Sequence, residues 1–191
     1  MRKSIIVVSG LPRSGTSLMM QILEAAGIPI LTDQKRKADE DNPRGYYEYE
    51  KVKQLRTDQS WLKNAQGKAV KIISALLKFL PPNYHYQVIF INRNLSEVLT
   101  SQRKMLIRTG KTANPNEDKK LLPLFQKHLK EIKSWLKEQS NTDLLEINYN
   151  LLIKNPTPQL KKLIRFLKIS IDLEKLATVI DPALYRQRAE F

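Results

Sequence analysis

The sequence predicts an α/β protein of three layers, in which helices cover both faces of a parallel sheet. Short apolar runs rich in β-branched residues alternate with longer segments of helical periodicity, which is the pattern of such folds. The first apolar run leads through a glycine-rich turn into a helical segment. A chain of 191 residues is long enough for one domain and too short for two ordinary ones. We therefore expect a single domain, residues 1–191, with its site at the carboxyl ends of the strands.

The N-terminal part of the chain supplies the first strand and the first helix. Residues 4–8 (SIIVV) are typical of a strand buried on both faces of a parallel sheet. Residues 16–26 (TSLMMQILEAA) have helical character, and Gly27 is a suitable C-terminal cap. The charged residues 32–45 lack apolar periodicity, so we expect an exposed loop there, followed by a short helix over residues 46–56.

Two more strands and a capped helix are expected in the middle of the chain. Residues 69–73 (AVKII) and 87–92 (QVIFIN) are apolar runs separated by a proline-containing break. Residues 94–108 predict a helix that begins at Asn94. Glu97 stands three residues after this N-cap, which is the spacing of a capping box.

The C-terminal part of the chain continues the alternation. Apolar residues at helical spacing predict a long amphipathic helix over residues 117–139, with His128 on its packing face. Residues 143–147 (DLLEI) predict a further strand, and residues 157–167 and 173–179 predict later helices.

Composition limits the classes of function. The formal net charge of +14 favours anionic ligands, but the few aromatic residues are not interleaved with the basic ones, so no nucleic-acid partner is expected. The chain has no cysteine, which excludes a thiolate metal site or a thiol nucleophile. It also has no apolar run of about 18 residues or more, so we expect no membrane span and a cytoplasmic protein.

Residues 9–17 (SGLPRSGTS) have the glycine spacing of a phosphate-binding loop, G-x-x-x-x-G-K-[ST], but Thr16 stands at the lysine position. A glycine-rich turn that enters a helix presents backbone N–H groups and the positive end of the helix dipole to an anion. A later strand ends in Asn92 and Arg93, where a magnesium-dependent NTPase needs a carboxylate. The loop therefore predicts a P-loop-type fold that binds phosphate without a metal, with Arg13 meeting part of its charge.

Residues 10–19 (GLPRSGTSLM) resemble the 5'-phosphosulfate-binding loop of sulfotransferases that use 3'-phosphoadenosine 5'-phosphosulfate (PAPS). Residues 92–104 (NRNLSEVLTSQRK) resemble a second segment of this family, in which a strand-end arginine and a serine eight residues later hold the 3'-phosphate. Arg93 and Ser101 have that separation. The resemblance implies that the loop contacts to the donor come from Arg13, Ser14, Gly15, Thr16 and Ser17.

Two further segments extend the resemblance. Residues 69–81 (AVKIISALLKFLP) are similar to a family strand that carries a lysine, although the proline that often follows it closely is absent. Residues 147–156 (INYNLLIKNP) are similar to a late family segment, with Asn150 in place of a glutamate. The basic glycine motif that many members have near the C-terminus is missing, and Arg186 and Arg188 are candidates to replace it.

The resemblance implies transfer of a sulfuryl group from PAPS to a hydroxyl or amine, with PAP (adenosine 3',5'-bisphosphate) as the product and no metal. Negative charge grows on the leaving 5'-phosphate, and we expect Arg13, the loop amides and Lys71 to stabilise it. A hydroxyl acceptor also needs a base, usually worth ~10² to 10⁴ in rate. We favour Glu48, which follows Gly45 and two tyrosines, because a carboxylate there is partly shielded from water.

The acceptor is expected to be a small molecule or a glycan, bound in part by the loop of residues 31–47. Two other functions stay open from the residues alone. One is a magnesium-dependent small-molecule kinase or NTPase, which the missing lysine and missing metal carboxylate disfavour. The other is a non-catalytic binder of a nucleotide or polyanion, which needs only the loop and the positive charge. The identity of the acceptor and the oligomeric state are not predicted.

Overall fold

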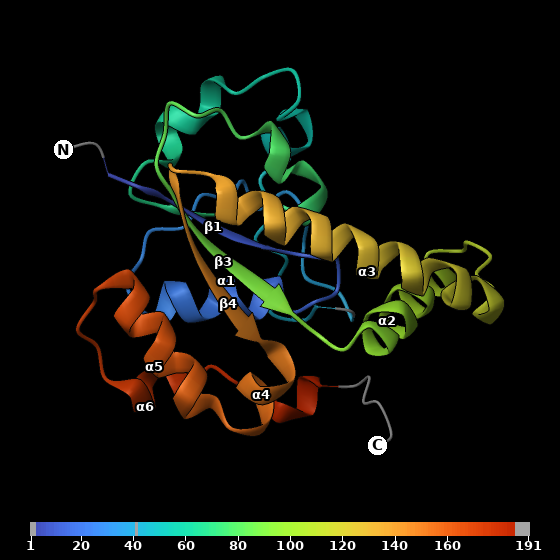
Figure 1. Ribbon diagram of the computed structural model, residues 1–191. Helices are drawn as coiled ribbons and strands as arrows, with labels where there is room; N and C mark the ends of the chain where they lie inside the picture. Colours follow the sequence, from blue (N-terminus) through green and yellow to red (C-terminus); the bar gives the residue numbers. More distant parts are fainter. Residues whose placement is uncertain (1–2, 41, 186–191) are drawn as a thin grey trace.

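A parallel sheet forms the centre of the protein. The computed structural model describes residues 3–40 and 42–185 (Figure 1). Within these residues the sheet has four strands in the order β2-β1-β3-β4, and every neighbouring pair is parallel. The strands are β1 (Ile5–Gly10), β2 (Ala69–Lys71), β3 (Tyr86–Asn92) and β4 (Thr142–Asn148).

Each face of the sheet is covered by its own layer, so the expected three-layer α/β fold is confirmed. On one face lie α1 (Thr16–Ala25), α5 (Pro156–Leu167) and α6 (Leu173–Ala177), and on the other lies α3 (Pro115–Glu138) (Figure 1). Alternate residues of β1 divide between the two cores because successive side chains of a strand point to opposite faces. All six residues of β1 are buried, as its β-branched run predicts.

The α3 face also carries short 3₁₀ helices, of which the sequence patterns predicted only the first, within the helix expected over residues 46–56. These are η1 (Glu50–Gln54), η2 (Ser60–Ala65) and η3 (Ser74–Phe79). Two short elements after β4 were also missed, namely α4 (Tyr149–Lys154) and η4 (Pro182–Leu184). Segments of this length carry too few apolar repeats to show a helical period.

The helix expected over residues 46–56 is wrong in its first half. Only η1 is helical there, because Tyr47 has a left-handed backbone (φ 53°) that cannot continue a right-handed helix. The Tyr47 hydroxyl donates a hydrogen bond of 2.6 Å to Glu24 in α1, which ties this segment to the helix after the glycine loop.

The helix α2 (Leu95–Arg108) begins as predicted, but its cap differs. The side chain of Asn94 accepts a hydrogen bond from the backbone N–H of Ser96. Glu97 does not return to the N–H of Asn94, as a capping box requires, because that N–H donates to the side chain of Asn150. The predicted capping box is therefore absent, and the Glu97 side chain is buried inside the protein.

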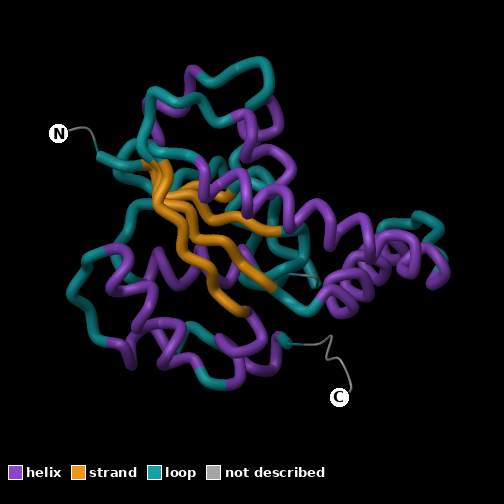
Figure 2. The backbone as a smooth tube through the Cα atoms, in the orientation of Figure 1, coloured by secondary structure: helices purple, strands orange, loops and turns teal. Residues whose placement is uncertain are grey.

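The carboxyl ends of the strands lie on the side of α2 and α4, where the connecting loops gather (Figures 1 and 2). β1 leads into the glycine loop, β3 into α2 and β4 into α4. Functional groups from distant parts of the sequence therefore meet at this edge. In the described part of the chain, no helix combines the length and the apolar character that crossing a bilayer requires.

Candidate active site

The glycine loop between β1 and α1 is held in a conformation that depends on glycine. Gly15 stands at the start of α1 with φ 102°, and a Cβ atom there would lie 2.2 Å from the ring of Tyr149. The backbone therefore passes directly over this ring. The neighbouring Ser14 turns its hydroxyl toward Gly10, where a Cβ would lie 2.6 Å from the Ser14 oxygen. Ser14 is buried under the loop, and its backbone N–H donates a hydrogen bond of 3.1 Å to the carbonyl of Leu11.

A pocket of about 220 Å³ opens at the loop. It is lined by every predicted site residue except Ser14 and Ser101. The strands, the start of α1 and the segment before η1 all contribute to its walls, so the structure brings together distant side chains, among them Arg13 and Arg93, which lie 80 residues apart in sequence. Arg36 and Tyr46, from the loop of residues 31–47 that was expected to bind the acceptor, also line the pocket. Tyr149 and Asp181 line it too, and no sequence signal singled them out.

Arg13 connects the two residues that were predicted to hold a 3'-phosphate. Its Nε donates a hydrogen bond of 3.0 Å to the Ser101 hydroxyl, and its backbone carbonyl accepts one of 3.1 Å from Nη1 of Arg93. The left-handed backbone of Arg13 (φ 74°) accompanies this arrangement. Ser101 is only 5% exposed and lies behind Arg13. Arg93 and Ser101 are therefore linked through Arg13, and their joint contact with a 3'-phosphate stays a prediction.

Arg93 is surrounded by groups that suit a cation. Its Nε donates to Oε2 of Glu97 at 2.9 Å, and both side chains are nearly buried, with exposures of 8% and 1%. The guanidinium carbon lies 4.6 Å from the ring centre of Tyr149 and 5.5 Å from that of Tyr185. Arg93 precedes α2, so the i,i+4 rule for helices did not predict its pairing with Glu97. The contact with Tyr185 has no local sequence signal either.

Lys71 ends β2 beside the glycine loop, because the parallel register places it opposite Val8 of β1. Its Nζ donates to the hydroxyl of Ser17 at 3.3 Å and to the backbone carbonyl of Tyr46. The side chain is 9% exposed. Burial lowers the pKa of Lys71 from 10.5 to about 8, although the carboxylate of Glu48 at 3.9 Å opposes this shift.

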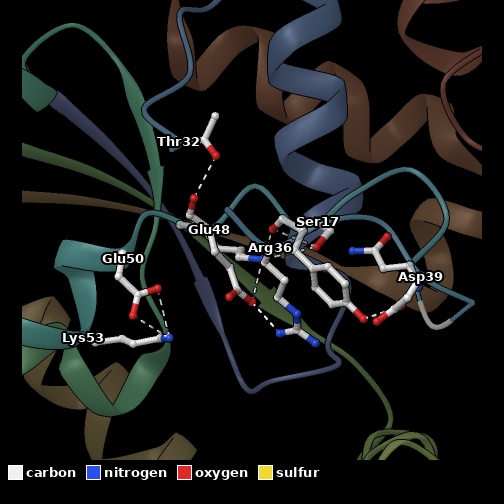
Figure 3. Close-up of polar contacts among 10 residues, drawn as sticks. Ser17, Thr32, Arg36, Asp39, Glu48, Glu50 and Lys53 are labelled. Atoms are coloured by element: carbon white, nitrogen blue, oxygen red, sulfur yellow. Dashed lines mark hydrogen bonds and ion pairs between the residues drawn. The ribbon is translucent and has the colours of Figure 1, made fainter. Parts of the chain in front are cut away.

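Glu48 faces the pocket, but it does not begin a helix. Its carboxylate is 2.8 Å from Nη1 of Arg36, and its backbone carbonyl accepts a hydrogen bond from Thr32 (Figure 3). The Arg36 guanidinium lies 3.4 Å from the ring centre of Tyr46. Burial raises the pKa of Tyr46 to about 12, so its hydroxyl stays protonated and donates to Asp39 at 2.6 Å. In this conformation Glu48 is an ion-paired carboxylate, with Arg36 as its nearest cation.

Neither histidine lies at the pocket. His85 precedes β3 at the amino end of the sheet, where its ring is 3.8 Å from Asp143. His128 shares a hydrogen bond of 2.8 Å with Ser74 between α3 and η3, which confirms its expected packing role. Among the described residues, Asp181 is the acidic side chain besides Glu48 that lines the pocket; it caps η4 and lies 3.3 Å from Arg44.

No group of three or more potential ligand side chains in the described residues is arranged to hold a metal ion. Asn92, which ends β3, donates to Glu146 at 2.9 Å, and Glu146 also pairs with Lys133 at 2.8 Å on the face covered by α3. Arg186 and Arg188, the candidates for a basic C-terminal contact, lie outside the described residues.

The fold and the site together define an α/β protein of the P-loop type, with a pocket lined by arginine and lysine side chains at the carboxyl edge of its sheet. Residues 3–187 match the family model described as the sulfotransferase domain. The chain therefore belongs to the sulfotransferase domain family, and the prediction made from residues 10–19 and 92–104 is confirmed.

Solved structures of similar fold agree with this family. The sulfotransferase domain from the curacin biosynthetic pathway is 14% identical, with a TM-score of 0.54, and the match covers 99% of this chain and 93% of that one. The sulfotransferase domain of the Synechococcus PCC 7002 olefin synthase is 13% identical, with a TM-score of 0.57 and coverages of 100% and 90%. Mouse sulfotransferase SULT7A1, solved in complex with PAP, is 18% identical, with a TM-score of 0.52 and coverages of 94% and 63%. No match to a curated protein was found.

Proposed function

We propose that this protein transfers a sulfuryl group from PAPS to a hydroxyl or amine of a small-molecule or glycan acceptor and releases PAP. The observation that carries the proposal is the meeting of Arg13, Lys71 and Arg93 at one glycine loop that lacks the lysine of an NTPase. Membership of the sulfotransferase family supports it, as does the PAP complex of the mouse structure. We also propose that one domain, residues 1–191, carries the whole site.

The start of α1 is proposed to hold the 5'-phosphosulfate. Gly15, Thr16 and Ser17 line the pocket, and the N–H groups in the first turn of a helix have no partner within it. Arg13 adds a positive charge beside them. Ser14 is buried and does not line the pocket, and its backbone N–H donates to the carbonyl of Leu11, so its proposed part is to hold the shape of the loop. The donor is thereby bound by backbone dipoles and cations, without a lysine at position 16.

Lys71 is proposed to contact the sulfuryl group and the bridging oxygen of the leaving phosphate. A sulfuryl oxygen would take the place of the Tyr46 carbonyl that now accepts from Nζ. As the acceptor oxygen attacks sulfur, the bond from sulfur to the 5'-phosphate oxygen breaks, and negative charge grows on that oxygen. Cations already held in place stabilise this charge with little reorganisation.

Arg93 is proposed to bind the 3'-phosphate, with Arg13 beside it. Ser101 then acts through Arg13, since its hydroxyl holds the Arg13 side chain. Glu48 remains our proposal for the base that accepts the acceptor's proton, and in this role its carboxylate would separate from Arg36. The segment of residues 31–47 carries Arg36 and Tyr46 and is proposed to contact the acceptor.

Calorimetric titration tests the donor site directly. The protein is titrated with PAP, with 5'-AMP and with ATP plus magnesium, and the series is repeated on Arg93→Ala. Binding that requires the 3'-phosphate and is lost in Arg93→Ala is expected. Preference for ATP with magnesium, with Arg93→Ala unchanged, would instead assign the loop to a kinase or NTPase. PAP binding without transfer to any acceptor in a screen would assign it to a non-catalytic binder.

A further inference from the structure

A buried carboxylate lies directly behind Arg93. Glu97 projects from the first turn of α2, and its side chain is 1% exposed. Its Oε2 accepts from Nε of Arg93 at 2.9 Å. Its Oε1 accepts from Nδ2 of Asn150 at 2.9 Å and from the hydroxyl of Tyr185 at 2.5 Å. Each of these three partners is a donor, so the arrangement needs an acceptor at both oxygens of residue 97.

Burial of a charge is tolerated only where partners replace its lost water. Glu97 receives these partners from the turn after β3, from α4 and from the segment after η4, which are far apart in the sequence. Such a cluster is costly to build and adds nothing to the apolar core. Its place directly behind a pocket residue points to a role in the site.

The ion pair fixes the orientation of the Arg93 guanidinium. Nε is held by Glu97 and Nη1 by the carbonyl of Arg13, so two different nitrogens of the planar group are fixed. The rings of Tyr149 and Tyr185 lie within 5.5 Å of the guanidinium carbon and restrict it further. Arg93 therefore presents one defined orientation to the pocket before any ligand binds.

We propose that Glu97 is a positioning residue of the donor site, which orients Arg93 and thereby sets the preference for a 3'-phosphorylated nucleotide. Asn150 and Tyr185 hold Glu97 in turn, so the segment that ends at Tyr185 takes part in this preference. The inference rests on the proposed function, because it assigns Arg93 to the 3'-phosphate.

If Glu97 acted only through its charge, removing it would change binding of the 3'-phosphate in the direction opposite to that expected from positioning. A carboxylate close to the bound 3'-phosphate repels it, so its removal would strengthen binding of the phosphate. If Glu97 acts by positioning, its removal weakens binding of the 3'-phosphate. The Arg93 guanidinium is then no longer preorganised and loses more conformational freedom when the phosphate binds. The variant Glu97→Gln separates the two, since glutamine keeps the shape but presents an NH₂ group to one of the three donors.

The test is the ratio of the Kd for 5'-AMP to the Kd for PAP, measured by calorimetry. We expect Glu97→Gln to lower this ratio about tenfold, as loss of a charge-assisted hydrogen bond predicts, with the Kd for 5'-AMP unchanged within about twofold. The matched control is Glu146→Gln, which alters a hydrogen-bonded glutamate on β4 that does not line the pocket and leaves the ratio unchanged. In an Arg93→Ala background, Glu97→Gln should cause no further change in the ratio.

Tyr185→Phe provides a milder variant if Glu97→Gln does not fold. It keeps the ring beside Arg93 and removes one donor to Glu97, so we expect the ratio to fall about threefold. A ratio of the Kd for 5'-AMP to the Kd for PAP that is unchanged or raised in Glu97→Gln overturns the inference. If Glu97→Gln does not fold, an unchanged ratio in Tyr185→Phe overturns it. A wild-type protein that binds PAP and 5'-AMP equally would overturn the proposed function itself, which is a distinct result.

Discussion

The hydroxyl of Ser101 accepts a hydrogen bond of 3.0 Å from Nε of Arg13, although the two residues are 88 positions apart. This bond joins the second turn of α2 to the glycine loop after β1. Arg93 reaches the same loop through the carbonyl of Arg13. The loop arginine and the two residues expected at a 3'-phosphate therefore form one connected unit.

Ser101→Ala should weaken PAP binding about tenfold, because the variant leaves the Arg13 side chain without its partner on α2. The free energy of unfolding should change by no more than about 1 kcal/mol, since alanine suits a helix. Calorimetry and chemical denaturation measure the two quantities. Thr109→Val, at the far end of α2, serves as the control and should leave PAP affinity unchanged. Equal PAP affinity in Ser101→Ala and wild type would contradict a role for this bond.

Gly15→Ala should destabilise the protein more than Gly27→Ala. Both glycines have positive φ, 102° and 78°, so alanine is strained at either position. A Cβ at Gly15 would also lie 2.2 Å from the Tyr149 ring, whereas one at Gly27 meets nothing within 4 Å. We expect Gly15→Ala to lose about 1 to 3 kcal/mol more of the free energy of unfolding, measured in urea. Equal losses would show that Tyr149 moves aside without cost.

The stability effect of Lys71 should depend on pH. Its pKa in the folded protein is lowered from 10.5 to about 8 by burial. Below pH 8 the amine is charged in both states and its burial destabilises the fold. Between about 8 and 10.5 the unfolded chain binds the extra proton, so the contribution of Lys71 to stability rises with pH.

Comparison of Lys71→Met with the wild type measures this effect. The stability of the variant relative to the wild type should be highest near pH 7 and should fall as the pH rises toward 10. Denaturation in urea at several pH values provides the test. A difference that stays constant from pH 7 to pH 10 would mean that the lysine is not desolvated as the structure describes.

Glu48→Gln should lower kcat by ~10² to 10⁴ while the Kd for PAP changes less than about twofold, because a base acts on the acceptor and not on the donor. The measurement is the rate of PAP release with an acceptor identified by screening. Asp181→Asn is the matched comparison, since Asp181 also lines the pocket. Loss of rate in Asp181→Asn alone would transfer the role of base to Asp181 and refute the assignment of Glu48.

The strand, loop and helix at the N-terminus were predictable because their signals are local. β-branched residues before Gly10 favour a buried strand, the spacing of Gly10 and Gly15 favours a phosphate-binding turn, and apolar periodicity favours a helix from Thr16. The same holds for α2, α3 and β4. Each of these elements is long enough to repeat its pattern several times.

The place of Lys71 in the site was predictable only on the condition that its strand ends beside the glycine loop. Its place at the end of an apolar run is visible in the sequence, but its contact with Ser17 depends on the parallel register that sets it opposite Val8. Register follows from how two whole strands pack, and no residue near Lys71 encodes it. In the structure β2 does end beside this loop, and Lys71 reaches Ser17.

The contacts around Arg93 depended on the tertiary structure. Local spacing favoured a capping role for Glu97, yet the buried partner Arg93 and the side chains of Asn150 and Tyr185 compete for the same carboxylate. A buried carboxylate is not hydrated and must be stabilised by protein donors. Three such donors stabilise Glu97 more than the single backbone N–H of a capping box at the helix surface would. Patterns along the chain determine which elements form, whereas the partners of a buried side chain depend on which distant residues the sheet brings within hydrogen-bonding distance.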